Sequence, residues 1–289
     1  MNYLLHILIM LCIYGILALS LNLLIGYAGL FSICHAAFYG IGAYASTLLM
    51  IKAGFNFFPA LIGGIFVSSL FAFLIAYPSL RLRGDYFILA TLGFQLIVYS
   101  ILYNWIGLTR GPYGIPGIPR ASLFGFEFDS IPLFLLLNSV IFLLVLFFVK
   151  KFYFSPFGRA LKAIREDEIA ASAMGKNLPL LKIWAFTVAG GVAAISGSLY
   201  ATYVTYIDPT SFTLDESIFL IAVVLVGGSG NMKGPLVGAL FMILLPEALR
   251  FLGLPDTIAP NVRQMIYGIL LIILMRYKPQ GIAGEYKFE

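Results

Sequence analysis

The sequence predicts an all-α membrane protein, a polytopic bundle of about 8–10 transmembrane helices. Of its 289 residues, 61% are hydrophobic and only 11% are charged, and the mean hydropathy is +0.98. A water-soluble domain cannot bury that much apolar surface in its core. The apolar residues also gather in runs that approach or exceed the roughly 20 residues needed to cross a hydrocarbon layer.

Nine such segments follow one another along the chain. The first 51 residues contain no Asp, Glu, Lys or Arg and supply two of them. Residues 3–25 are expected to be a retained span and not a cleaved signal peptide, and a second span begins near Leu30. The others cover residues 57–78, 86–105, 131–149, 181–206, 217–228, 235–252 and 262–275. The segment ending at Gly228 is short for a crossing, so a broken or re-entrant helix is expected.

Glycines mark two connections between these segments. The first connection joins the first two spans and contains Gly26, Gly29, Gly40 and Gly42. These glycines are expected either to let helices pack closely or bend, or to line a translocation path. The second connection, residues 227–235, lacks the G-x-x-x-x-G-K-[ST] pattern of a phosphate-binding loop, so a tight turn is predicted. The two stretches are alike enough to predict two repeated halves.

The distribution of charge predicts the orientation of the chain. Basic residues at positions 81, 83, 150–182, 233, 276 and 278 fall on one side if the spans alternate, and that side is expected to be cytoplasmic, with the C-terminus. The other side receives Asp208, Asp215 and Glu216. It also receives the Gly- and Pro-rich loop 109–130, either a plain connector or a landing surface with Glu127 and Asp129 on its rim.

Residues 155–182 form the one long polar segment of the chain. Ser155 with Pro156 is typical of a helix start, and Asp167 with Glu168 provides a second one. Gly175 fits the left-handed residue that ends such a helix. The second helix presents small and apolar side chains that suit a groove of another protein, although basic residues on the membrane surface offer an alternative interpretation.

Polar residues inside the predicted spans are few. Asn22, His35 and Gln95 are candidates for the translocation path, although a structural role is the favoured interpretation of His35. Cys12 and Cys34 lie in apolar stretches and are expected to be buried thiols. The sequence offers no catalytic grouping, no metal ligands and no cofactor-binding motif, so enzyme chemistry is not expected.

Several motifs in order along the chain resemble one known family. They include LNLLIGYAGLFSICHAAFYGIGAYAS (residues 21–46), LRGDYFILATLGF (82–94), LTRGPYGIPGIP (108–119), GRALKAIREDEIAASAMG (158–175), VVLVGGSGNMKGPLVGA (223–239) and RYKPQGIAG (276–284). Together they resemble the LivM-type permease subunit of branched-chain amino-acid ABC importers. The histidine motif, Ser32-Ile-Cys-His35, is closer to LivM than to its sister type, LivH.

The resemblance implies that residues 1–289 are one transmembrane permease domain in the inner membrane. It implies a LivH-type second permease, two ATPases that carry ATP and Mg, and an extracytoplasmic binding protein. Residues 155–182, named the coupling segment below, are then expected to dock on an ATPase through Arg165, Glu168, Ala170, Ala171, Met174 and Gly175. A permease for urea or short amides on the same scaffold, and a stand-alone secondary transporter or channel, are the alternatives.

Overall fold

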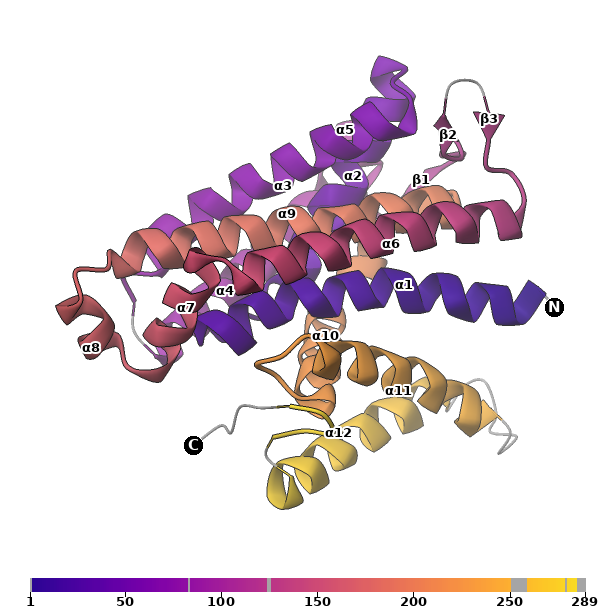
Figure 1. The fold of residues 1–289 in the computed structure, drawn as a ribbon. Coiled ribbons are helices and arrows are strands. Elements are labelled where there is room, and N and C mark those ends of the chain that lie inside the picture. Colours follow the sequence, from indigo (N-terminus) through magenta and orange to yellow (C-terminus); the bar gives the residue numbers. More distant parts are fainter. Residues whose placement is uncertain (1, 83, 124–125, 251–258, 279, 285–289) are drawn as a thin grey trace.

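The computed structural model describes residues 2–82, 84–123, 126–250, 259–278 and 280–284 (Figure 1). Helices dominate it, as the sequence predicts. The first half contains α1 (Asn2–Asn22) with its π-helical continuation η1 (Leu23–Ala28), α2 (His35–Ala53), α3 (Phe57–Ser79), α4 (Asp85–Asn104), α5 (Ile106–Thr109), η2 (Gly111–Tyr113), β1 (Ile115–Pro116), β2 (Ser122–Leu123) and β3 (Phe126–Glu127).

The second half of the chain includes the longest described helix, which has 27 residues. It contains α6 (Ile131–Phe154), α7 (Pro156–Glu166), α8 (Glu168–Ala173), α9 (Leu178–Val204), β4 (Tyr206–Ile207), η3 (Pro209–Phe212), α10 (Leu214–Gly227), α11 (Lys233–Arg250) and α12 (Ala259–Tyr277). Each of the nine predicted apolar segments overlaps a described helix of 14 residues or more. Residues 251–252 of the predicted span 235–252 lie outside the described residues.

Five of the described helices are long and apolar enough to span a membrane: residues 3–28, 57–79, 85–104, 131–154 and 178–204. By contrast, α10 has only 14 residues, a length of about 21 Å against a hydrocarbon core of about 30 Å. The predicted short segment is therefore confirmed as a short helix. The two predicted repeated halves stay a prediction.

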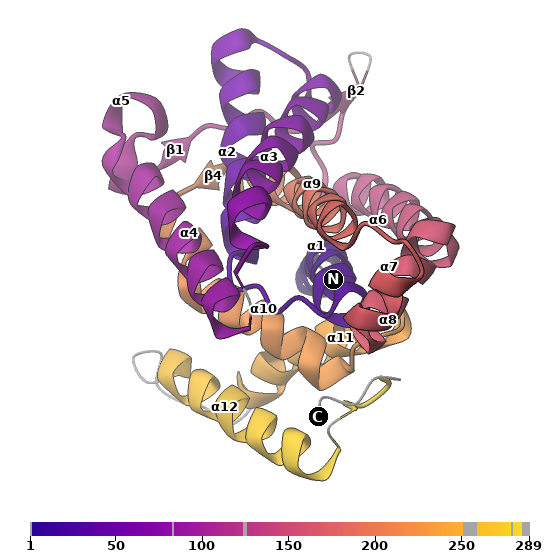
Figure 2. The ribbon, with the colours of Figure 1, turned by 90° about the vertical axis from the view of Figure 1, so that its left-hand side faces the viewer.

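The first helix forms the centre of the bundle. Figure 2 shows α1 end-on with α6, α9, α10 and α11 around it, and α12 lies on the outside. Every residue from 15 to 28 is buried. A helix that is apolar on all sides needs such a position, because each of its faces then packs on protein.

Small residues bring α2 and α9 into close contact. At Gly42, an added Cβ would overlap the backbone of Ala194, and at Gly197 it would overlap the carbonyl oxygen of Tyr39. These helices therefore approach through their backbones, as the sequence predicts for its small residues. Gly29 has a φ of +67° and ends η1, which confirms that glycine allows a bend at this point.

The end of the bundle opposite α7 and α8 carries the short strands (Figure 1). β1 pairs with β4 in an antiparallel arrangement, and β2 pairs with β3. Arg120 and Asp129 form an ion pair within this loop. The predicted extended character of residues 109–130 is confirmed in these strands, and the pairing with β4 joins the loop to the segment that precedes α10.

Replacing Gly197 with alanine should lower the apparent melting temperature of the purified protein in detergent. The new methyl group meets the Tyr39 carbonyl, which cannot rotate away, and such overpacking costs about 1–3 kcal/mol. Gly93→Ala is the control, because no described atom lies within 4 Å of a Cβ there and the helix gains up to about 1 kcal/mol in propensity. Equal melting temperatures for both variants would contradict the close α2–α9 crossing.

Candidate coupling site

The coupling segment folds into two short helices because its sequence carries a cap at each start. Ser155 Oγ accepts a hydrogen bond from the amide three residues later (3.1 Å), and Pro156 occupies the first turn of α7. The Asp167 carboxylate accepts hydrogen bonds from two amides of α8 (2.8 and 3.0 Å). Gly175 has a φ of +74°. Both predicted starts and the predicted stop are therefore confirmed.

The second of these helices exposes apolar side chains. Ile169 is 84% exposed and Met174 is 64% exposed, and Ala170 beside them is also exposed. Ala171 is fully buried, so this predicted docking residue packs inside the chain. The exposed side chains form an apolar surface, which we call the α8 surface (Ile169, Ala170 and Met174), with no covering element among the described residues.

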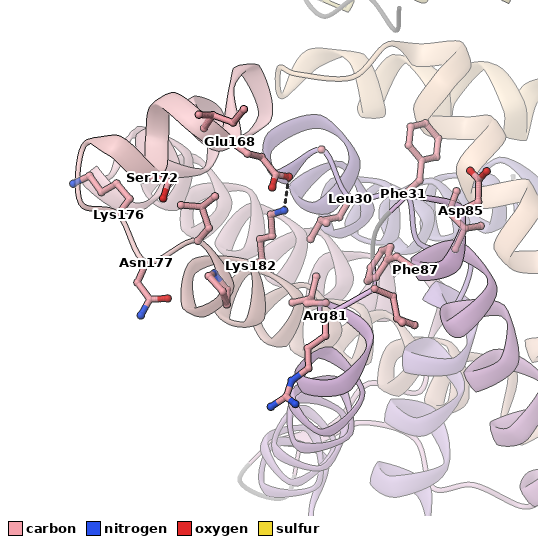
Figure 3. Close-up of a pocket in the computed structure, with 18 residues that line it drawn as sticks. Leu30, Phe31, Arg81, Asp85, Phe87, Glu168, Ser172, Lys176, Asn177 and Lys182 are labelled. Carbon is pink, nitrogen blue, oxygen red and sulfur yellow. Dashed lines mark hydrogen bonds and ion pairs between the residues drawn. The ribbon is translucent and has the colours of Figure 1, made fainter.

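A cavity of about 970 Å³ lies beside this surface (Figure 3). Its walls come from α8, the start of α9, the loop between η1 and α2, and the connection from α3 to α4. The lining residues are Gly29, Leu30, Phe31, Leu80, Arg81, Leu82, Gly84, Asp85, Phe87, Ile88, Glu168, Ile169, Ser172, Lys176, Asn177, Leu178, Pro179 and Lys182. The lining combines apolar side chains with the charged groups of Arg81, Asp85, Glu168, Lys176 and Lys182.

An ion pair fixes one wall of this cavity. The Lys182 Nζ atom at the start of α9 lies 2.5 Å from the Glu168 Oε1 atom at the start of α8, and Figure 3 shows the pair facing the cavity. The Glu168 side chain is 60% exposed, whereas that of Lys182 is 13% exposed. Because solvent screens the carboxylate, the pair is expected to contribute no more than about 1 kcal/mol, so the contact orients α8 more than it stabilises the fold.

The first coupling helix is attached to the end of the central helix. Arg165 Nη1 donates a hydrogen bond to the Gly26 carbonyl oxygen in η1. The Lys162 Nζ atom lies 4.9 Å from the centre of the Tyr27 ring, a cation–π contact. A π-helical turn leaves backbone groups out of the regular ladder, and Arg165 binds one of them. This predicted docking residue therefore also connects α7 to α1.

From there, hydrogen bonds continue to the turn between α10 and α11. Asn22 Nδ2 donates to the Asn231 carbonyl oxygen (2.8 Å) and to the Tyr153 hydroxyl (3.2 Å), and Asn22 Oδ1 accepts from the Gly230 amide (3.2 Å). The Tyr153 ring stacks on Tyr27 at 3.8 Å. These contacts make Asn22 a structural connection, and its role in a translocation path stays a prediction.

The start of α2 lies inside the bundle and depends on side chains from other helices. Gln95 Oε1 accepts a hydrogen bond from the Ala37 amide (2.7 Å), and Gln95 Nε2 donates to the Phe212 carbonyl oxygen (2.9 Å). Ser217 Oγ accepts from the Ala36 amide (3.0 Å). Gln95 thus satisfies buried backbone groups at the breaks before α2 and α10.

His35 is the first residue of α2 and is fully buried. Its Nε2 atom lies 2.6 Å from Ser20 Oγ of α1, while its Nδ1 atom has no hydrogen-bond partner among the described residues. The contact with Ser20 supports the structural interpretation of this histidine. Among the described residues, no three His, Cys, Asp or Glu side chains are grouped as metal ligands would be.

Sequence reasoning missed most partners of these residues. Tyr153 and Ser217 carried no pattern that marks them, because each lies in or beside an ordinary apolar run. Asn231 was the exception: an amide residue inside a glycine-rich turn is a known backbone-binding signal, and its Oδ1 atom accepts from the Gly234 amide (2.7 Å).

Comparison with known proteins agrees with this architecture. The chain is 34% identical to the LivM permease proteins of the high-affinity branched-chain amino acid transport systems of Salmonella typhimurium and Escherichia coli, over 93% of this chain and 67% of each relative. It is 28% identical to the probable LivM protein of Methanocaldococcus jannaschii, over 94% of this chain and 91% of that protein. It is 26% identical to the LivH permease protein of Salmonella typhimurium, over 96% of this chain and 92% of that protein.

No solved structure matches the chain. The sequence pattern of one family matches almost its whole length, residues 3–275, and the family is described as the permease component of the branched-chain amino acid transport system. The long apolar helices agree with a multi-pass membrane protein of this kind. The chain therefore belongs to the branched-chain amino acid transport permease family.

Proposed function

We propose that this chain is the transmembrane permease subunit of an ATP-driven importer for branched-chain or other hydrophobic amino acids. The Salmonella typhimurium and Escherichia coli relatives, at 34% identity, are named as permease proteins of high-affinity branched-chain amino acid transport systems. Residues 1–289 act as one permease domain and form half of the translocation path. A second permease of the LivH type forms the other half.

One observation carries the coupling part of this proposal. The α8 surface is apolar, exposed and next to a cavity of about 970 Å³ at the same end of the bundle (Figure 3). A soluble partner can insert an apolar side chain or a short helix there and bury both surfaces, which favours association. The proposed occupant is a cytoplasmic ATPase, one for each permease.

The hydrogen bonds within the chain suggest how docking affects the spans. Arg165 and Lys162 hold α7 against η1, and Asn22 connects α1 to the turn before α11. When ATP closes the two ATPases, movement of the coupling segment is passed to α1 and α10 as rigid bodies. Access to the path then switches from the outside, where a loaded binding protein docks on the strand-bearing end, to the inside.

The chemistry of ATP hydrolysis belongs to the partners in this proposal. The ATPases hold ATP and Mg, and the permease itself carries no cofactor and performs no catalysis. The complex lies in the cytoplasmic membrane, with the coupling segment and the C-terminus on the cytoplasmic side because basic residues concentrate there.

Replacing Met174 with aspartate should weaken binding of the co-encoded ATPases at least about tenfold, because a carboxylate would be buried without a partner. The measurement is retention of the ATPases by the detergent-solubilised, tagged permease pair. Tyr113→Asp makes the same kind of change at an exposed aromatic residue on the opposite end of the bundle and should retain the ATPases.

Equal retention by Met174→Asp and wild type would rule out the α8 surface as the docking site. A lower melting temperature of the Met174→Asp variant is not expected, since its side chain is largely exposed.

A charge exchange tests the ion pair of the cavity wall. Glu168→Lys should reduce ATP-dependent leucine uptake by the reconstituted importer, and the added exchange Lys182→Glu should restore most of it, because the two charges face each other at 2.5 Å. The effect of the single change on stability should stay below about 1 kcal/mol. If the double variant transports no better than the single one, Glu168 acts on the ATPase directly and not through Lys182.

A further inference from the structure

Glu216 lies in the first turn of α10, deep in the bundle and not on the outer side where the charge pattern places it. Ser217, the next residue, donates a hydrogen bond to Gln95 (3.2 Å). Gln95 lies ten residues after Asp85, the first residue of α4, and therefore about 15 Å along that helix. The hydroxyl of Tyr14, from the middle of α1, lies next to the Glu216 carboxylate. The position of the carboxylate is therefore near the middle of two long helices, and the predicted outer position is wrong. The chain between β4 and α10 runs inward, which the charge pattern could not show.

The fold does not use this carboxylate in the way its sequence suggests. Thr213 and Glu216 have the spacing of a capping box, in which a glutamate binds the amide of the cap residue. Thr213 makes no side-chain capping hydrogen bond, and the Glu216 Oε1 atom is buried without a hydrogen-bond partner among the described residues. None of the described ion pairs includes it. An ionisable group at such depth typically marks the path of a substrate or ion.

A cavity opens directly at this carboxylate. Its volume is about 430 Å³, within the usual size of small-ligand sites. One part of its wall is polar, with Asp215, Glu216 and the Tyr14 hydroxyl, and another is apolar, with Phe219 and Leu271. The walls come from α1, α10 and α12, so the site joins the central helix to the short helix and to the outermost one.

We propose that Glu216 receives the ammonium group of the transported amino acid while the apolar wall accepts its aliphatic side chain. This inference rests on the proposed function. The carboxylate accepts charge-assisted hydrogen bonds from the ammonium group, which are stronger than those between neutral groups. Asp215, exposed at the same cavity, adds negative potential that attracts the cation. A single buried ionic contact gives the weak binding that a conduit needs for release.

The test uses the complete importer in proteoliposomes, with its ATPases, second permease and binding protein. Glu216→Gln keeps the shape and removes the charge, so leucine uptake per ATP hydrolysed should fall about tenfold or more, while ATP hydrolysis stimulated by the binding protein persists. Glu216→Asp should restore part of the uptake. Glu247→Gln, the same change in α11 and outside the cavity, should behave as wild type.

A second variant covers the case in which Glu216→Gln does not fold. Gly268 lines the same cavity, and no described atom lies within 4 Å of a Cβ there, so Gly268→Leu adds an apolar side chain at the cavity wall without a clash. It should lower leucine uptake per ATP at least about fivefold while Glu216 keeps its charge. Gly93→Leu, on α4 and equally open, is the matched control.

The outcomes separate this inference from the proposed function. If the wild-type complex shows no ATP-dependent leucine uptake, the proposed function fails. If wild type transports and either Glu216→Gln or Gly268→Leu, once folded, matches it in uptake per ATP, the ammonium site is overturned. If Glu216→Gln melts at a lower temperature and loses uptake and ATP hydrolysis together, Gly268→Leu decides: wild-type uptake per ATP in that variant overturns the proposal, and a loss of at least about fivefold supports it.

Discussion

Buried backbone groups at the helix breaks inside the bundle need hydrogen-bond partners from the protein itself. The side chains that supply these hydrogen bonds determine how the helices are held together. At the start of α2, the amides of Ala36 and Ala37 bind Ser217 and Gln95. At the end of α1, the π-helical turn offers the Gly26 carbonyl to Arg165. Each break is thus closed by a side chain from a distant element, so the breaks themselves hold the helices in place.

This arrangement gives α10 two points of attachment. Its first turn is fixed to α2 and α4 through Ser217, and the turn after it is fixed to α1 through Asn22. A helix held at both ends by hydrogen bonds moves with its neighbours and does not bend on its own. The coupling segment reaches the second attachment through Arg165 and η1, and the Glu216 cavity lies at the first. The proposed docking site and the proposed substrate site therefore sit on one continuous path.

Local features of this fold could be predicted from the sequence, and long-range ones could not. Apolar runs place the nine described helices of 14 residues or more, and the caps Ser155 and Asp167 place α7 and α8, because each signal depends only on nearby residues. The contact between Asn22 and Tyr153 joins residues 131 positions apart and has no local pattern. Glu216 was misplaced for a related reason: a charge beside a span is normally outside it, and only the tertiary course of the chain reverses that rule.

The glycine-rich end of α10 also bears on how the protein is made. The carbonyl oxygens of Val226 and Gly227 accept hydrogen bonds from the amides of Ile282 and Ala283, both at 2.9 Å, and these partners follow α12 in the chain. During synthesis, α10 leaves the ribosome before α11 and α12. Its C-terminal carbonyls therefore gain these two partners only after the chain has been made past position 283. The packing of this helix end is consequently completed later than that of the helices before it.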